Sequence, residues 1–292
     1  MKSKLFASLL AAGSLALVGS VAAQTPPAPK LTFPQASPPS TLKQQVGITD
    51  IEITYHRPSM KGRQIFGGLV PYGQVWRTGA NTATKLTFST PVKFGGADIP
   101  AGTYELFTIP GESEWTVIVH KNMSQWGSYA YDQKNDVARV TAKAAKTSWA
   151  VETFSIWFNE LRDTSATLNL TWENTHVGIP ITADTVGMLA PQIEAVMAGN
   201  AEKKPYFPAA MFYLENNHDL PKALEWVNAA IAARPGQMWM IYRKGLILEK
   251  MGDKAGAKAA AEESLALTEK DKPGELRDEY IRLNQALIER VK

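Results

Sequence analysis

The sequence predicts an all-β antiparallel sandwich, or a jelly-roll-like barrel, followed by an all-α helical repeat domain. From residue 41 to about residue 182, apolar and polar residues alternate with period two in short runs separated by turn residues. This pattern is typical of half-buried strands. After residue 183 the apolar residues recur at helical spacing, and part of that pattern repeats after 34 residues. We therefore expect a β domain at 41–182 and a helical domain at 184–292.

The first 23 residues have the features of a signal peptide. Lys2 and Lys4 form a short positive region, residues 5–21 are almost purely apolar, and small residues end at Ala23. This arrangement predicts cleavage after Ala23 and a periplasmic or secreted protein. A retained anchor is the alternative, although the apolar run is at the short end of the ~20 residues that a spanning helix needs. We expect no membrane span after cleavage.

Residues 24–40 are expected to form a proline-rich leader. The stretch TPPAPKLTFPQASPPS, at 25–40, contains six prolines. Proline fixes its own backbone in an extended conformation and cannot donate a backbone hydrogen bond. The segment therefore predicts an extended, poorly ordered connection ahead of the β domain.

Charge and cysteine content exclude several classes of function. Removal of Lys2 and Lys4 from the 31 basic residues leaves 29 basic against 28 acidic residues, a net charge of +1. A nucleic-acid partner is not expected, because a binding domain of that kind shows a strong basic bias. The sequence has no cysteine, so it has neither disulfides nor a thiolate zinc site.

Strands of the β domain are indicated in chain order by alternating runs and turn residues. Residues 115–120 are apolar on both faces, which favours a central strand. Pro100–Gly102 and Pro110–Gly111 are turn signals between strands. The remaining expected strands are at 51–56, 85–88, 103–107, 153–158 and 167–172.

The helical domain contains a degenerate internal repeat. A first helix has apolar residues at 186, 189, 193, 196 and 197, and Pro191 should break or kink it. Asp219–Ala223 aligns with Asp253–Ala257 at an offset of 34 residues. This period, with small residues where helices must approach each other, resembles tetratricopeptide repeats over about 205–270. The resemblance is degenerate, because Glu269 stands where Pro235 closes the first unit.

A last helix is expected to complete the stack, with one apolar face formed by Leu276, Tyr280, Leu283 and Leu287. Stacked helix pairs form a concave surface suited to a protein or peptide partner. The alternative is a short helical cap that only stabilises the sandwich.

One segment concentrates positive charge. Tyr55–Asn81 contains His56, Arg57, Lys61, Arg63 and Arg77 among glycines, prolines and aromatic residues, and it has no acidic residue. Its glycines permit turns that are closed to other residues. It therefore predicts a long, folded-over loop with a defined shape.

The same segment carries a resemblance to a known family. The sequence is similar to the secreted bacterial proteins grouped as domain of unknown function family 2911, over about 41–182. The resemblance implies an exported envelope protein, often from Bacteroidetes-type bacteria and sometimes with C-terminal helical repeats; it implies no reaction. The motifs that carry it are Tyr55-x-Arg57-Pro58-Ser59-x-Lys61-Gly62-Arg63, Ile65-Phe66-Gly67, Leu69–Gly73, Trp76–Asn81, Pro100–Tyr104 and Gln125-Trp126-Gly127.

Two interpretations of the basic segment are open. In the first, arginines offer forked donors to a carboxylate, phosphate or sulfate, a lysine adds a point charge, and aromatic rings supply flat faces for a sugar or peptide. In the second, the arginines are buried clasps that pair with strand carbonyls and with carboxylates such as Glu52, Asp98 or Glu105. The candidate ligand-binding residues are Arg57, Lys61, Arg63, Tyr72, Trp76, Arg77, Asn81 and Trp126.

The aromatic loop at 126–131 has two similar interpretations. Its rings form a binding surface, because exposed aromatic patches mark such surfaces, or they fold back as a lid over one end of the sandwich.

Catalytic and cofactor signals are weak. The four histidines lack metal-ligand spacing, no nucleophile elbow occurs, and no phosphate-binding glycine motif opens a helix. We expect no metal, no cofactor and no catalytic residue, and hence a non-enzymatic envelope binding or scaffold protein. The alternative is an envelope hydrolase acting on a glycan or peptide, with His56, Glu105 or His120 as acid or base. A structural role for Glu105, as the ion-pair partner of a loop arginine, competes with that alternative.

Overall fold

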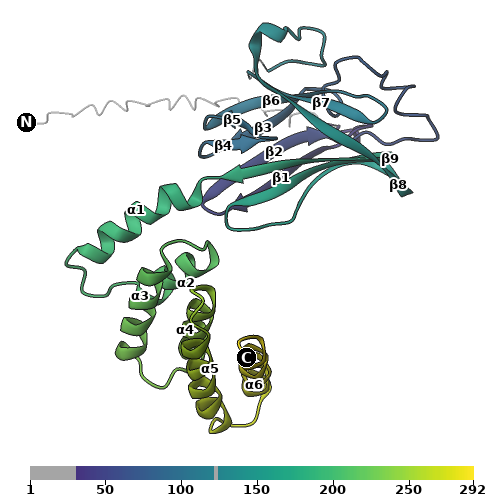
Figure 1. Ribbon diagram of the computed structural model, residues 1–292. Helices are drawn as coiled ribbons and strands as arrows, with labels where there is room; N and C mark the ends of the chain where they lie inside the picture. Colours follow the sequence, from purple (N-terminus) through teal and green to yellow (C-terminus); the bar gives the residue numbers. More distant parts are fainter. Residues whose placement is uncertain (1–30, 122–123) are drawn as a thin grey trace, which may run out of the picture. The chain divides into compact units, whose positions relative to one another are not determined.

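The computed structural model describes residues 31–121 and 124–292. A β region of nine antiparallel strands precedes six helices, as the sequence predicts (Figure 1). The predicted signal peptide and the leader up to residue 30 lie outside the described residues. The first strand begins at Pro39, so the last two residues assigned to the leader already belong to the β domain. Within the described ranges, no helix combines the length and apolarity needed to cross a membrane.

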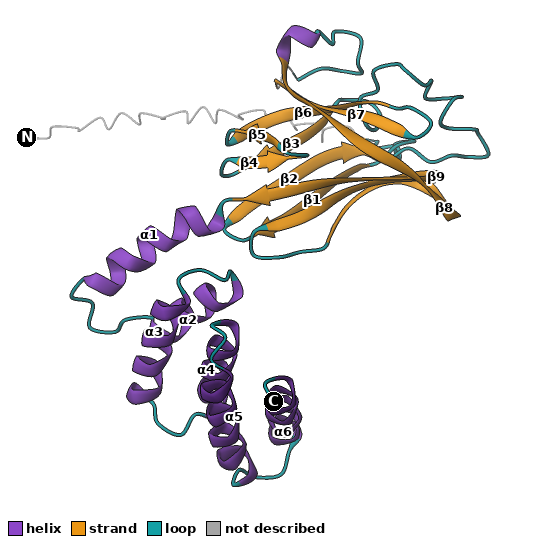
Figure 2. Cartoon of the chain, in the orientation of Figure 1, coloured by secondary structure: helices purple, strands orange, loops and turns teal. Residues whose placement is uncertain are grey.

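The strands form one connected sheet in the order β1-β2-β3-β6-β7-β8-β9-β4-β5. A short 3₁₀ helix, Gln133–Asn135, precedes β8. The two longest strands, β8 and β9, run side by side in Figure 2. The bounds are β1 Pro39–Val46, β2 Thr49–His56, β3 Thr84–Phe88, β4 Val92–Phe94, β5 Ala97–Ile99, β6 Gly102–Ile109, β7 Glu114–Lys121, β8 Asp136–Asn159 and β9 Ser165–Ala183.

Strand β8 connects the two layers of the sandwich. Its first part, up to Lys143, pairs with β7, and its second part, from Ala144, pairs with β9. A strand that passes from one sheet to the other in this way makes a corner of the sandwich. The inward side chains of both layers meet in one core, whose members include Ile51, Leu86, Leu106, Val117, Phe154, Ile156, Leu170 and Ile179.

The basic loop between β2 and β3 closes one end of this core. Ile65, Phe66, Val70 and Trp76 are buried there among strand residues. Their burial removes apolar surface from water, and this is the main force that holds a long loop without regular hydrogen bonding in place. The predicted folded-over loop is therefore anchored by its apolar residues, and its charged residues lie around them.

The six helices follow β9 without another strand among the described residues. Within the part of the chain that the structure describes, each of the two repeat units is a helix pair, α2 with α3 and α4 with α5. Asp219 and Asp253, which the 34-residue offset aligns, cap α3 and α5 in the same way, by accepting from the backbone N–H three residues on. The bounds are α1 Thr185–Ala198, α2 Tyr206–Glu215, α3 Leu220–Ala233, α4 Met238–Lys250, α5 Lys254–Glu269 and α6 Glu275–Arg290.

The structure refines two expectations for the helices, one at Pro191 in α1 and one for the apolar face of α6. Helix α1 does not end at Pro191 but continues to Ala198, and the Gln192 Nε2 donates to the Met188 carbonyl, 2.8 Å away. In α6 the expected apolar face is only partly buried. Leu287 is buried and Tyr280 and Leu283 pack against the helical core, whereas Leu276 is half-exposed.

Candidate functional site

The structure divides the predicted site residues into separate groups. Arg57 donates from Nε to the Phe154 carbonyl (3.1 Å) and from Nη2 to Ser155 Oγ (2.7 Å) on β8. Arg63 donates to the carbonyls of Met60 and Ser59 within its own turn. Arg57 is therefore held by a carbonyl and a hydroxyl of β8, in line with the clasp interpretation, whereas Arg63 is exposed and is held by carbonyls of its own turn. Lys61 is exposed in the same turn.

None of the carboxylates proposed as clasp partners holds a loop arginine. Glu52 pairs with Lys43, and Asp98 pairs with Lys93. Glu105 contacts His120 and Gln125 instead. This corrects the expectation of arginine–carboxylate clasps in the basic segment: the arginines that are held are held by carbonyl and hydroxyl oxygens.

Trp76 belongs to the core rather than to an open surface. Its side chain is only 8% exposed, its ring stacks on Trp172 with centroids 5.9 Å apart, and Nε1 donates to the Gly79 carbonyl. Both faces of the indole are therefore occupied by the protein. Tyr72 is half-buried and packs against the same core, and burial raises the pKa of its phenol.

Arg77 differs from the other arginines. Its Nε is buried and has no hydrogen-bond partner, and among the described residues its guanidinium forms no ion pair. The group lies over the Trp126 ring, with Cζ 5.7 Å from the ring centroid. A buried donor without an acceptor costs about 1–3 kcal/mol, so an unpaired guanidinium here requires an explanation other than stability.

The backbone next to Arg77 is strained. Thr78 and Asn81 have φ of 53° and 58°, in the left-handed region that residues other than glycine avoid. Thr78 is buried and donates from Oγ1 to Thr108 Oγ1, while its carbonyl accepts from Thr84 Oγ1. Such strain persists only where the surroundings enforce it, and it clusters at functional sites. It fixes the chain direction directly after Arg77.

Two aromatic rings accompany Arg77 on the surface. Trp126 is 62% exposed and Tyr129 is 81% exposed, and their rings lie nearly parallel, at 19°, with centroids 5.9 Å apart. Gly127, at φ +76°, sits between these groups, because a Cβ there would lie 2.7 Å from the Tyr129 ring and 3.0 Å from Arg77 Nη1. We call Arg77, Trp126, Gly127 and Tyr129 the arginine–aromatic surface.

A buried carboxylate anchors the loop that carries these rings. Glu105 accepts from the backbone N–H of Gln125 (2.8 Å) and from its Nε2 (3.0 Å). The Gln125 carbonyl in turn accepts from the Ala83 N–H, and Gly127 donates to the Asn81 carbonyl. The loop is thereby tied to β6 and to the segment after Arg77, which places Trp126 beside the guanidinium.

The partner of Glu105 is His120, which the strand register places directly opposite it. His120 Nδ1 is 3.7 Å from Glu105 Oε2 and 2.7 Å from the Lys121 carbonyl, and Nε2 is 3.2 Å from the Asp132 carbonyl. The imidazole is therefore enclosed by two backbone carbonyls and the Glu105 carboxylate, all within the core.

The rest of the aromatic loop turns inward. Tyr131 packs against Phe107 and His120, and its hydroxyl donates to Asp136 Oδ2 at 2.7 Å while Arg139 donates to both. Burial, followed by the Asp136 hydrogen bond, raises the pKa of Tyr131 to about 12. The loop therefore combines both interpretations of its sequence, with Trp126 and Tyr129 displayed and Tyr131 folded back.

The candidate acids and bases of a hydrolase are poorly placed for a substrate. Glu105 and His120 are fully buried. His56 is half-buried, its Nδ1 lies 3.4 Å from Thr82 Oγ1, and burial lowers the pKa of its imidazole. Among the described residues, no three His, Asp or Glu side chains gather as a metal site requires.

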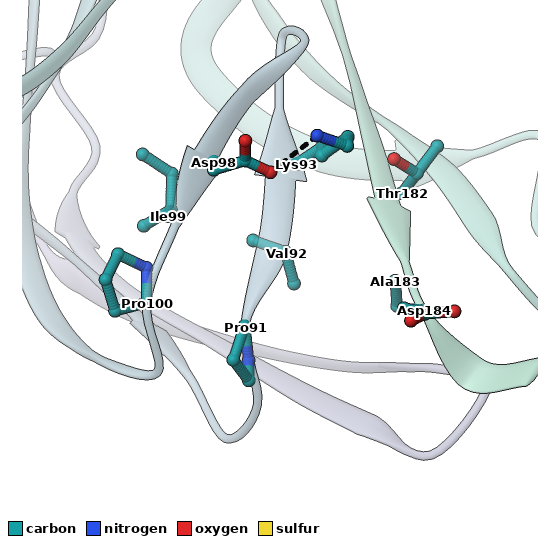
Figure 3. Close-up of a pocket in the computed structure, with 9 residues that line it drawn as sticks. All are labelled: Pro91, Val92, Lys93, Asp98, Ile99, Pro100, Thr182, Ala183 and Asp184. Carbon is teal, nitrogen blue, oxygen red and sulfur yellow. Dashed lines mark hydrogen bonds and ion pairs between the residues drawn. The ribbon is translucent and has the colours of Figure 1, made fainter. Parts of the chain in front are cut away.

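A pocket of about 670 Å³ at the ends of β4, β5 and β9 is shown in Figure 3. Its charged groups already have partners in the protein. Lys93 pairs with Asp98 at 2.5 Å, and Asp184 caps α1 by accepting from the Gly187 N–H. The lysine of the pocket is therefore already paired, and Asp184 uses one of its oxygens in the cap.

Comparison with known proteins agrees with the motifs of the basic segment. Residues 37–181 match the model of a family described as protein of unknown function (DUF2911). The match covers the β domain and ends before the helices. None of the curated proteins matches the chain. Tyr129 and Gly127 were absent from the residues predicted from the sequence, although the aromatic composition of their loop was a signal. Over residues 37–181, its β domain, this chain is similar to the DUF2911 family.

Proposed function

We propose that the β domain binds an acidic glycan at the arginine–aromatic surface, without catalysis. In this proposal Arg77 receives a carboxylate of the glycan, and the Trp126 and Tyr129 rings pack against its sugar rings. Asn81, which orients the same loop through its carbonyl, belongs to the site as a positioning residue. The predicted signal peptide supports an envelope location for this activity.

The unpaired guanidinium of Arg77 is the observation that carries the proposal. Arginine presents donors in a planar fork that matches a carboxylate. Elsewhere in the basic segment, Arg57 and Arg63 use such donors on the protein itself. Arg77 has no protein acceptor among the described residues, yet the backbone around it is strained and the loop beside it is anchored. The buried Nε is closed to an external anion, but the Nη atoms of Arg77 also have no bonded acceptor among the described residues, and an external anion would pair with these atoms.

The aromatic rings favour a glycan over a simple inorganic anion. Two large rings exposed next to each other mark a binding surface. The face of an aromatic ring is negative, so it attracts the weakly positive C–H bonds of a sugar ring. A glycan that carries carboxylates would use the rings and the guanidinium together.

The helices are proposed to bind a protein or peptide partner. The two helix pairs with equivalent caps support a stack of the kind that presents a concave surface. A hydrolase has less support, because Glu105 and His120 are buried and tied to the loop rather than open to a substrate.

Titration of the purified protein with tri-galacturonic acid, followed by calorimetry, tests the glycan site. We expect saturable binding to the acid and at least about tenfold weaker binding to its methyl ester, since loss of a charged hydrogen bond of ~1.5–3 kcal/mol corresponds to that factor or more. Trp126→Ala should weaken binding by a similar factor. Gly127→Ala should also weaken it, because the added methyl displaces the Tyr129 ring and Arg77.

Arg63→Met is the matched control for Arg77→Met. The Arg63 guanidinium is committed to carbonyls of its own turn, so its removal should leave the affinity unchanged, whereas Arg77→Met should weaken it at least tenfold. Equal binding of acid and ester, equal effects of the two arginine variants, or no saturable binding by the wild type would each refute the proposal.

A further inference from the structure

A second hollow, of about 760 Å³, lies on β8 and β9. Lys146 pairs with Thr175 and Ser155 pairs with Thr171. Between these pairs β8 advances nine residues and β9 only four, so β8 carries five residues more than its partner. The surplus is accommodated by bulges on both sides of Val151. Bulges re-aim side chains and are frequent next to binding sites, and here they form an arch that carries Trp149.

Two indole rings line this groove. Trp149 on the arch is 64% exposed, and Trp157 on the strand is 40% exposed. Phe154 and Ile156, next to Trp157 in the strand, are buried in the core, so Trp157 is on the outward side of β8, and Trp149 is exposed on the arch. Exposed tryptophan side chains leave large apolar surfaces in contact with water, which is unfavourable unless a ligand covers them.

The polar groups of the groove are held in defined positions. Trp157 Nε1 donates to Thr171 Oγ1 at 3.0 Å. His176 Nε2 lies 2.7 Å from Asn169 Oδ1, and the Asn169 Nδ2 donates to the Thr167 carbonyl. The amide oxygen therefore faces the imidazole, which makes Nε2 the donor and leaves Nδ1 as an acceptor in the neutral ring. Such bonds preorganise a site before the ligand arrives.

Charge limits the kind of ligand that fits. No carboxylate is present among the described residues that line the groove, so no negatively charged group there pairs with a cation. Lys146 is the only residue of the lining with a permanent charge, and its Nζ donates to Thr175 Oγ1. The remaining polar atoms are hydroxyls and an imidazole, which pair with neutral hydroxyl groups. The volume lies within the ~300–1,000 Å³ typical of small-molecule sites.

We propose that this groove binds a short neutral oligosaccharide. A sugar ring would pack its C–H face on Trp149 and Trp157, and its hydroxyls would pair with His176 Nδ1 and the threonine and serine hydroxyls. Arg57 acts as a positioning residue, because it holds Ser155 Oγ and the Phe154 carbonyl at one end of the groove. The groove shares no residue with the arginine–aromatic surface, and its ligand carries no charge.

Calorimetric titration with cellotetraose, maltotetraose and N-acetylchitotetraose tests the groove. We expect saturable binding of at least one of these neutral sugars by the wild type. Trp149→Ala should weaken that binding at least about tenfold, as expected for an anchoring aromatic residue. Trp149→Tyr should restore much of it, because a ring face returns. Trp149 is a suitable target because its backbone carbonyl, not its indole, accepts the Thr147 Oγ1 bond that shapes the arch.

Trp126→Ala is the matched control on the other surface and should leave the binding of the neutral sugar unchanged. The proposal is overturned if none of the three sugars binds the wild type. It is also overturned if Trp149→Ala binds as the wild type does, or if Trp126→Ala abolishes the binding instead. None of these outcomes bears on tri-galacturonic acid, so failure of this site is distinguishable from failure of the glycan site at Arg77.

Discussion

Glu105→Ala should lower the free energy of unfolding of the β domain by about 3–5 kcal/mol. Glu105 is fully buried, and each buried donor left without its acceptor costs about 1–3 kcal/mol. Here the change leaves His120 in the core without its carboxylate and leaves two donors of Gln125 without an acceptor. Urea unfolding followed by circular dichroism measures the loss.

Glu52→Ala is the matched control for this prediction. Glu52 lies on β2 and pairs with Lys43 in a solvent-exposed ion pair, which contributes at most about 1 kcal/mol. If Glu105→Ala destabilises the domain no more than Glu52→Ala does, the buried anchor does not exist as described. Because the same carboxylate holds the loop of Trp126, Glu105→Ala should also abolish binding of tri-galacturonic acid.

Trp76→Ala should destabilise the β domain by about 3–5 kcal/mol, the loss typical of removing a large aromatic side chain from a core. The indole touches Phe66, Trp115, Phe154 and Trp172, and its removal leaves a cavity among them. The midpoint of urea unfolding should fall while the dependence on urea concentration stays the same.

Trp126→Ala makes the same substitution on an exposed ring of the same domain. Surface substitutions away from special features change stability by about 0.5 kcal/mol or less, so its unfolding midpoint should stay close to that of the wild type. Similar losses for the two variants would contradict the assignment of Trp76 to the core and Trp126 to the surface.

The fold class was predictable because local chemistry determines it. Period-two runs such as 153–158 place alternate residues on opposite faces of a strand, and the structure buries Phe154 and Ile156 while exposing Trp157. The 34-residue offset likewise aligned Asp219 with Asp253, and the structure shows that each caps a helix. The bulges of β8 were not predictable, because they depend on how many residues of β9 lie opposite, and this is a property of the folded pair.

The candidate site was predictable as a region but not residue by residue. Trp76 and Trp126 both lie in segments with neighbouring glycines and polar residues, yet one is in the core and the other is exposed. Arg57 Nε reaches a carbonyl of β8, whereas Arg77 Nε has no acceptor, and the sequence around the two arginines does not show this difference. Trp157 did carry a signal, because a tryptophan at an outward position of an alternating strand is unusual, and the groove on β8 and β9 is built around it.

The most direct test of the glycan site is the thermal unfolding midpoint of Arg77→Met, measured with and without tri-galacturonic acid. Methionine keeps the aliphatic packing of arginine and removes the unpaired Nε. The account predicts a midpoint without ligand equal to or above that of the wild type, and a ligand-induced rise in the wild type alone. A fall of several degrees without ligand, at roughly 2–4 °C per kcal/mol, would show that Arg77 is a structural clasp. An equal ligand-induced rise in both proteins would place the glycan elsewhere.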